Sequence, residues 1–342
     1  MFKESELFLK YKSSYTNASF DFFRHMLFLS SAFFCMWYLK DTYLNIFTVL
    51  LVGLLNIKTF TIFHDCGHHS YTPNKTLNYI LGTITGTIVY TPFCWSYLHN
   101  THHLTNGSVD NEYQFSFNEL IIFTLNQYKK MTFTQKMILK VFYSPYILFT
   151  VLSYIKFLLI ERVYVVVFFI NKYAYKPSTF VLLLEQILNN IGVFLMIYIQ
   201  YNYSILRQSL LAASVSICVG TMLFFNQHTY NPAYVTNNEK WTMKDSGLKG
   251  SSFIQIPKYL KYFTGSIEYH HVHHMISKIP GYNLQKYHEE VVSKSDMFDN
   301  IVKLSISKCY QNLWLSLYDE DKQKFITFTE ADSKLDPDDK VN

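Results

Sequence analysis

HDCGHH at residues 64–69 is the first of three histidine-rich stretches; the others are HNTHH at 99–103 and HHVHH at 270–274. An α-helix places residues three and four positions apart on the same face. Each stretch can therefore aim two or three imidazoles at one point if it is helical. The residues that share a face in this way are His64 and His68, then His99, His102 and His103, then His270, His273 and His274.

His228 follows a long apolar run and raises the number of candidate ligands to nine. Imidazole is the commonest side-chain ligand for iron, zinc and copper. One metal ion takes about four to six ligands, so the nine imidazoles predict two metal ions. The set contains no thiolate cage, and neutral nitrogen ligands favour these three metals over calcium or magnesium.

Four other histidines fit the pattern less well. His69 lies off the face shared by His64 and His68. His271 lies three residues before His274, so spacing alone leaves its role open, and we prefer His270 because it repeats the spacing of the second stretch. We interpret the remaining two, His25 and His288, as ordinary histidines.

The histidines have two further interpretations. A lone histidine is more often a buried or solvated residue than a ligand, but three spaced clusters are hard to obtain by chance. The segment from His64 to His68 also resembles the HExxH helix of zinc proteases, with Asp65 replacing the glutamate. A protease has no use for the six further clustered histidines. The carboxylates predicted either to orient imidazoles or to remain solvated are Asp65, Asp110, Glu112 and Glu268.

The composition of the 342 residues indicates a membrane protein. Charged residues make up 16%, against roughly 25% in typical soluble domains, while aromatic residues reach 18%. The net charge of +5 is not gathered into basic blocks, so we expect no nucleic-acid partner. Five scattered cysteines without a CxxC motif predict a reduced compartment, and the N-terminus shows no signal peptide.

Apolar runs predict two membrane hairpins, one from residues 26–38 and 44–63 and the other from 180–200 and 205–225. The shorter run at 77–94, rich in glycine and threonine, predicts a re-entrant or interfacial segment, with a buried helix as the alternative. A third apolar stretch, 141–170, is interrupted by Lys156, Glu161 and Arg162, so both interfacial helices and a further span stay open.

The distribution of lysine and arginine follows the positive-inside pattern and predicts that both termini and all histidine clusters face the cytosol. The expected fold is all-α, with about four transmembrane helices in two hairpins and a cytosolic helical cap that holds a di-metal site. We divide the chain into an N-terminal segment 1–25, a membrane domain 26–318 and a charged tail 319–342, which we expect to be disordered.

These stretches resemble the membrane-bound fatty acid desaturases with three histidine boxes. The matching segments are HDCGHHS at 64–70, HNTHHLTNGSVDNE at 99–112, FFNQHTYNPAYV at 224–235, and 250–284, which contains TGSIEYHHVHH and IPGYNL. The resemblance covers roughly residues 30–290. It implies four spans, a cytosolic cap with two iron ions bound by the nine histidines, and O2-dependent removal of two hydrogens from an acyl chain to give a cis double bond.

The resemblance also indicates a subfamily. The third box begins with His270 rather than glutamine, and no HPGG haem motif is present, so front-end desaturases are disfavoured. Three residues separate the histidines of the first box, and Phe224 stands where stearoyl-CoA desaturases have an asparagine. The pattern is nearest to methyl-end, omega-6 or Δ12-like acyl-lipid desaturases and their bacterial relatives.

The resemblance implies partners as well: an acyl-lipid or acyl-CoA substrate, the bilayer, and a separate electron donor, either cytochrome b5 or ferredoxin with its reductase. The membrane would be the endoplasmic reticulum in a eukaryote and otherwise the plasma membrane. Two alternatives stay open. One is a hydroxylase, acetylenase or carotenoid-modifying oxygenase on the same scaffold. The other is a membrane metal-binding or transport protein, which the position of the histidines at helix ends disfavours.

Aromatic residues near the boxes are candidates to line an acyl channel, although ordinary packing explains each of them equally well. They are Trp95, Tyr97, Trp241, Tyr262 and Tyr269.

Overall fold

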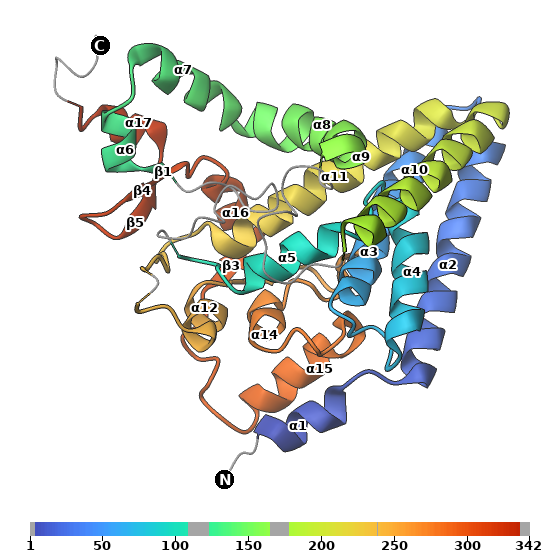
Figure 1. Ribbon diagram of the computed structural model, residues 1–342, viewed down its shortest axis with the longest axis horizontal. Coiled ribbons are helices and arrows are strands. Elements are labelled where there is room, and N and C mark those ends of the chain that lie inside the picture. The colour runs from blue at the N-terminus through green and yellow to red at the C-terminus, as the bar shows by residue number, and fades with distance from the viewer. Residues whose placement is uncertain (1–3, 109–122, 165–177, 238, 336–342) are drawn as a thin grey trace.

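The computed structural model describes residues 4–108, 123–164, 178–237 and 239–335 of the chain. Helices dominate the described part, and five short strands form two small sheets at its edges. Figure 1 shows long helices on one side of the molecule and short helices gathered around their ends on the other. The all-α prediction is therefore confirmed, with the two small sheets added to it.

The first predicted hairpin consists of α2 (Tyr15–Tyr38) and α3 (Asn45–Gly67). The side chain of Ser14 accepts a hydrogen bond from the Asn17 amide and thereby caps α2. The helices pack through buried aliphatic residues such as Leu29, Met36 and Val52. Before them, α1 (Glu4–Tyr11) lies against the helix that follows the third histidine stretch.

The second hairpin consists of α10 (Thr179–Asn202) and α11 (Leu206–His228). α11 packs closely on α3 at Gly53, where an added Cβ would lie 2.8 Å from Val215. Three described helices, α3, α10 and α11, are long and apolar enough to cross a membrane. α2 is not among them; its first half carries Asp21 and Arg24.

The run at 77–94 contains α4 (Lys75–Ile88), which packs against both α3 and α10. Its 14 residues are too few for a span of about 20. Gly86 allows the close approach to α3, because a Cβ there would lie 2.9 Å from Phe63, and a Cβ at Gly82 would lie 2.5 Å from Phe93 in the loop after α4. This short helix is fixed by packing on its two neighbours.

The interrupted stretch at 141–170 is described up to Tyr164, and its remainder lies outside the described residues. Together with the helix before it, it forms a bent pair: Phe133–Phe142 and Ile147–Val163 lie at 63° to each other and can count as one further span. Its charges are accommodated by pairing: Lys156 Nζ lies 2.7 Å from Glu161 Oε1, and Arg162 donates to the Tyr90 carbonyl. The segments are α7 (Phe133–Phe142), η2 (Ile147–Leu152), α8 (Ser153–Ile155), η3 (Lys156–Ile160) and α9 (Glu161–Tyr164).

Short elements between and after the hairpins form what we call the cap. Strands β2 (Phe253–Gln255) and β3 (Lys303–Ser305) pair in parallel within it, with Ile254 opposite Leu304. Its helices are α5 (Trp95–His103), α12 (Met243–Lys249), α13 (Lys261–Thr264), α14 (His270–Met275), α15 (Gly281–Val292) and α16 (Ile306–Asn312).

The expectation of a disordered tail is wrong for residues 319–335. β4 (Leu317–Asp319) and β5 (Lys324–Ile326) form an antiparallel pair, and β1 (Phe123–Thr124) extends it in parallel beside β4. Leu317, Ile326 and Ala331 are fully buried among residues of α6 and α7. A few apolar side chains thus fix a segment whose overall composition is charged. The flanking helices are α6 (Leu125–Lys129) and α17 (Phe328–Asp332).

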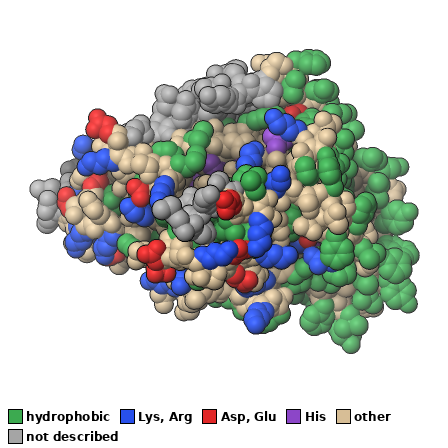
Figure 2. All heavy atoms as spheres, turned by 90° about the horizontal axis from the view of Figure 1, so that it is seen from below, with side chains coloured by type: hydrophobic (Ala, Val, Ile, Leu, Met, Phe, Trp, Pro, Cys, Tyr) green, Lys and Arg blue, Asp and Glu red, His purple; other side chains and the backbone are tan. Residues whose placement is uncertain are grey.

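The surface is divided in the same way as the fold. Hydrophobic side chains cover the side formed by the long helices, while lysine, arginine and acidic side chains cover the cap (Figure 2). Large exposed apolar residues are frequent on α2 and α10, for example Phe23, Phe34, Phe194 and Tyr198. An apolar face of this extent indicates lipid contact, as expected of a membrane protein.

Candidate metal centre

The structure brings all nine candidate histidines together in two groups at the junction of the long helices and the cap. Within each group every residue offers one ring nitrogen, and these nitrogens all lie within 4.8 Å of one another. Eight of the nine side chains are buried and His228 is half-buried. The first histidine group is His64, His68, His99, His103 and His273; the second histidine group is His102, His228, His270 and His274.

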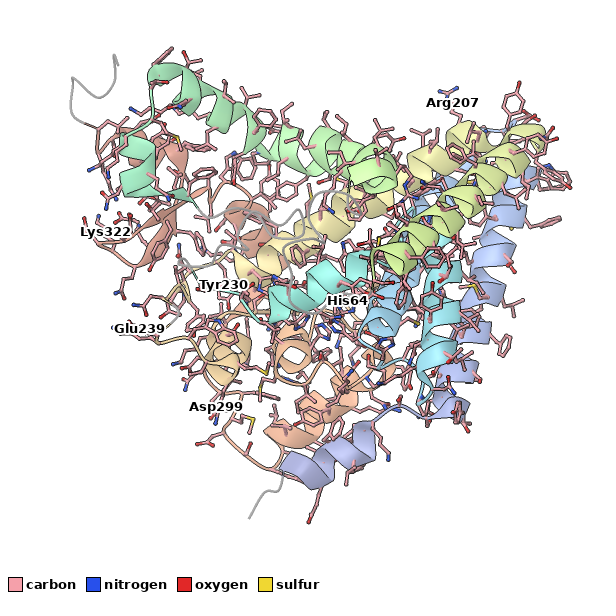
Figure 3. All side chains as sticks on the ribbon, in the orientation of Figure 1. His64, Arg207, Tyr230, Glu239, Asp299 and Lys322 are labelled. Atoms are coloured by element: carbon pink, nitrogen blue, oxygen red, sulfur yellow. The ribbon has the colours of Figure 1, made fainter. Side chains whose placement is uncertain are left out.

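The first histidine group is assembled from α3, α5 and α14. His64 lies in the last turn of α3, and His68 caps its end. The Nε2 atom of His99 lies 2.8 Å from that of His64 and 3.1 Å from that of His103. The Nε2 atoms of His273 and His103 are 3.0 Å apart. Figure 3 shows His64 deep in the molecule, near the ends of α3 and α5.

The second histidine group is assembled from α5, α11 and α14. His228 is the last residue of α11, and its Nε2 atom lies 3.1 Å from that of His102 and 2.9 Å from that of His270. The two histidine-rich cap helices therefore divide their side chains between the groups. On α5, His102 faces away from the first histidine group, and on α14 only His273 joins it. The spacing of the histidines in the sequence predicted that those of each helix share a face, but it did not predict that they divide between two groups.

Hydrogen bonds on the outer side of two rings fix how they are turned. The Nδ1–H group of His228 donates to the Gly250 carbonyl at 2.9 Å, which leaves the lone pair on Nε2 for the second histidine group. Nδ1 of His64 lies 3.2 Å from Oδ1 of Asp65, whose other oxygen accepts a hydrogen bond from the Gly281 amide at 2.6 Å. Such outer contacts are typical of metal-binding imidazoles.

The protonation state also suits metal binding. For six histidines of the two groups, burial, followed by the effect of neighbouring charges, lowers the pKa far below its ordinary value. These are His68, His99, His103, His270, His273 and His274. Neutral rings with converging nitrogens place several lone pairs at one point, which is unfavourable unless a cation lies between them. Among the described residues, Nε2 of His68 and both ring nitrogens of His274 have no hydrogen-bond partner. The residues therefore fit two nitrogen-bound metal ions.

Aromatic rings cover parts of both groups. Trp95 stacks on His99 with ring centres 4.6 Å apart. Phe224 lies 5.2 Å from the ring of His102 and 5.4 Å from that of His228. These apolar contacts shield the imidazoles from water.

The other channel candidates have contacts elsewhere. Tyr97 donates to Glu185 at 3.2 Å, and Trp241 donates to the Asn106 carbonyl at 2.9 Å. Tyr262 lies beside His25 and Lys58, and Tyr269 stacks on Phe253 in the cap core.

The remaining histidines lie outside both groups. His271 points toward His288, with 2.8 Å between Nε2 of the first and Nδ1 of the second. His25 is buried, with its Nε2 atom 2.9 Å from the Thr59 hydroxyl. His69 follows His68 with a φ of 52° and contacts the ring of Phe93.

Of the four carboxylates predicted to orient imidazoles, Asp65 has the expected position. Glu268 instead accepts a hydrogen bond from the Thr264 hydroxyl at 2.6 Å. Asp110 and Glu112 lie outside the described residues. The backbone groups of Gly250 and Gly281 that hold His228 and Asp65 were not among the candidates. Gly250 begins the segment 250–284 and Gly281 lies in its IPGYNL motif, and this segment is one of those that carry the family resemblance.

Comparison with known proteins agrees with this architecture. The family described as fatty acid desaturase matches residues 41–300. A fatty acid desaturase of Bacillus subtilis (strain 168) is 29% identical over 310 residues, which cover 86% of this chain and 82% of the relative. An sn-1 acyl-lipid omega-3 desaturase (ferredoxin) of Nostoc sp. (strain 36) is 27% identical over 297 residues, or 82% and 76% of the two chains.

A shorter match is also to a fatty acid desaturase. The omega-6 fatty acid desaturase, endoplasmic reticulum isozyme 2, of Glycine max is 28% identical over 95 residues, which cover 23% of this chain and 24% of the relative. The match to the family extends over three of the four long helices and all three histidine stretches. The chain belongs to the fatty acid desaturase family of enzymes.

Proposed function

We propose that this enzyme uses O2 and a histidine-bound di-iron centre to insert a cis double bond into the acyl chain of a membrane lipid. Two hydrogens from adjacent methylenes, with two electrons and two protons supplied from outside, would reduce one O2 to two waters. The observation that carries the proposal is the pair of buried histidine groups, with five and four converging ring nitrogens.

Reduction of O2 at bound iron would supply the oxidising power needed for an alkane C–H bond, which has no acidic or basic handle. The chain's own residues would bind the metal ions and orient their ligands. The nine imidazoles, in their neutral form, would hold the metals. Asp65 and the Gly250 carbonyl would fix the rings of His64 and His228. Trp95 and Phe224 would exclude water from the exposed sides of the groups.

The electrons would come from a separate carrier. The Nostoc relative carries ferredoxin in its name, which supports ferredoxin as the donor, with cytochrome b5 as the alternative class. The charged cap lies on one side of the apolar helices. The positive-inside pattern of lysine and arginine supports a cytosolic cap and cytosolic termini, where such a donor would dock.

The test is expression in a host that lacks the product, with analysis of double-bond position in total lipid. The wild type should produce a new cis-unsaturated chain, and His273→Ala should produce none. His288→Gln is the matched control, because that histidine lies outside both groups. A hydroxylated or acetylenic product would replace the proposal with the corresponding oxygenase. Metal uptake without any modified lipid would replace it with a binding or transport role.

A further inference from the structure

A polar cavity of about 240 Å3 lies beside the first histidine group, between α2, α3, α13 and the start of α15. Its wall holds three cationic side chains, Arg24, Lys58 and Lys261, and two carboxylates, Asp21 and Asp65. We propose that this cavity binds the head-group phosphate of a membrane phospholipid and thereby selects acyl chains carried by phospholipids. The inference rests on the proposed desaturase function and names its substrate class.

Asp21 does not oppose an anion strongly, because two cations neutralise it, and the oxygens of Asp65 are engaged with other groups. Oδ1 of Asp21 lies 2.7 Å from Lys58 Nζ and accepts from Arg24 at 3.0 Å, while Oδ2 accepts from the Tyr71 hydroxyl at 3.1 Å. The oxygens of Asp65 face His64 and the Gly281 amide. With three cations against two such carboxylates, the wall retains a positive charge.

Two of the cations, Lys58 and Arg24, converge on the Tyr262 ring, and donors remain for a ligand. The Lys58 ammonium lies 4.6 Å and the Arg24 guanidinium 5.2 Å from the centre of the Tyr262 ring. Nε of Arg24 has no hydrogen-bond partner among the described residues. Lys261 Nζ donates to the Tyr269 hydroxyl at 2.9 Å, which occupies one of its three donors. Arginine and lysine donors of this kind suit a phosphate oxygen.

The position of Lys58 supports a binding role. It lies within the candidate span α3 and is only 5% exposed. An ionisable side chain inside a span is costly and commonly functional. Its ion pair with Asp21 ties α2 to α3, which accounts for one cation and one carboxylate. Arg24 shares this carboxylate, so among the described ion pairs Lys261 is the cavity cation that neither Asp21 nor Asp65 neutralises.

The size of the cavity matches a head-group phosphate. Its volume is below the roughly 300–1,000 Å3 of sites for drug-sized ligands. A phosphate with part of its glycerol fits this space, and the acyl-CoA arm of the experiment tests the other substrate class. Because Asp65 lies in its wall and contacts His64, a phosphate bound there would hold the lipid next to the first histidine group.

The test uses the full-length, metal-loaded enzyme in lipid nanodiscs. Variants are Lys261→Gln alone and Arg24→Gln with Lys261→Gln; Lys286→Gln, on exposed α15 surface outside the cavity, is the matched control. Native mass spectrometry measures retained phosphatidylglycerol against a neutral diglycosyl diacylglycerol with identical acyl chains. Desaturation of both lipids and of acyl-CoA is followed in parallel, with inorganic phosphate as a soluble competitor.

The wild type and Lys286→Gln should retain phosphatidylglycerol at least about tenfold better than the glycolipid. The glycolipid has no phosphate, so it lacks one charged hydrogen bond to the cavity. The cavity variants should lose this preference and raise KM for the phospholipid with kcat little changed. Thermal unfolding and metal content check that each variant is folded. If the double variant fails to fold, Lys261→Gln alone decides the outcome.

Equal retention of the two lipids by the wild type, or an unchanged preference in the cavity variants, would overturn the phosphate site. Displacement by inorganic phosphate without any lipid preference would assign the cavity to a soluble anion and also overturn it. If the wild type turns over acyl-CoA efficiently and the cavity variants keep this turnover, the phosphate site is likewise overturned. If the lipid preference is present but no lipid is desaturated, the proposed function fails and the phosphate site stands.

Discussion

His103 and His274 stack with their ring centres 4.0 Å apart and their planes 18° from parallel, although they belong to different histidine groups. His103 comes from α5 and His274 from α14, so this contact also joins the two histidine-rich cap helices. The ring contacts of His68, in contrast, are with members of its own group: His64, His99, His103 and His273. The two groups are therefore physically continuous through specific residues.

This contact predicts different effects for two alanine variants of the first histidine group. His68→Ala should remove metal from the first histidine group and leave the second occupied, giving about one metal ion per chain. His103→Ala removes a ligand and also the stacking partner of His274, so metal content should fall below that of His68→Ala. Elemental analysis of purified protein measures both values. Equal metal content in the two variants would show that the stacked pair does not couple the groups.

Asp65 gives a second prediction, because it holds His64 from outside the first histidine group. Asp65→Asn should weaken metal binding or activity by about 10- to 100-fold, the usual effect of losing such a partner. Competition with a chelator measures the affinity. Glu268→Gln is the control, since this buried carboxylate contacts Thr264 and not one of the nine histidines. If Asp65→Asn binds metal as tightly as Glu268→Gln does, Asp65 does not support the metal centre.

The sequence located the nine histidines and the two hairpins because both depend on local patterns. A spacing of three or four residues shows which imidazoles share a helix face, and a long apolar run shows which helix meets lipid. The division of α5 between the groups was not predictable in this way. It depends on where α11 and α14 place His228 and His273, which is set by tertiary packing.

Charge was the less dependable signal. Lys156 and Glu161 argued against a span, yet they neutralise each other at 2.7 Å. In the tail, the acidic and basic residues concealed two consecutive apolar residues, Phe325 and Ile326, which are both buried. Pairing with β1, about 190 residues earlier, completes the fold of this segment, and a composition argument cannot detect such a distant partner.

The ordered tail leads to a stability prediction. Ile326 is fully buried against residues of α6 and α7, so Ile326→Ala should lower the free energy of unfolding by about 2–5 kcal/mol. Lys322→Ala, at the exposed turn between β4 and β5, should change it little. Thermal unfolding with protease susceptibility of residues 317–335 measures the effect. Equal susceptibility of the two variants would mean that this segment does not fold in solution.

The attachment of α1 to the cap predicts a dependence on pH. Hydrogen bonds from Lys10, Lys294 and Tyr11 lower the pKa of Glu290 to about 2 from its ordinary value of 4.5. The unfolded carboxyl takes up its proton first, so this contribution to stability is complete above pH 4.5 and is lost as the pH falls toward 2. Pepsin cleavage within α1 should therefore increase across this range in the wild type.

Glu290→Gln lacks the charged acceptor, so pepsin should cleave its α1 readily even at pH 4.5, with little further change at lower pH. Glu289→Gln is the matched control, because Glu289 accepts a hydrogen bond only from Gln285 on its own helix among the side-chain contacts described. This control should follow the wild-type pH profile. A Glu290→Gln profile that coincides with that of Glu289→Gln would show that α1 is held by its apolar contacts, such as Leu7 with the core of α15, and not by the Glu290 carboxylate.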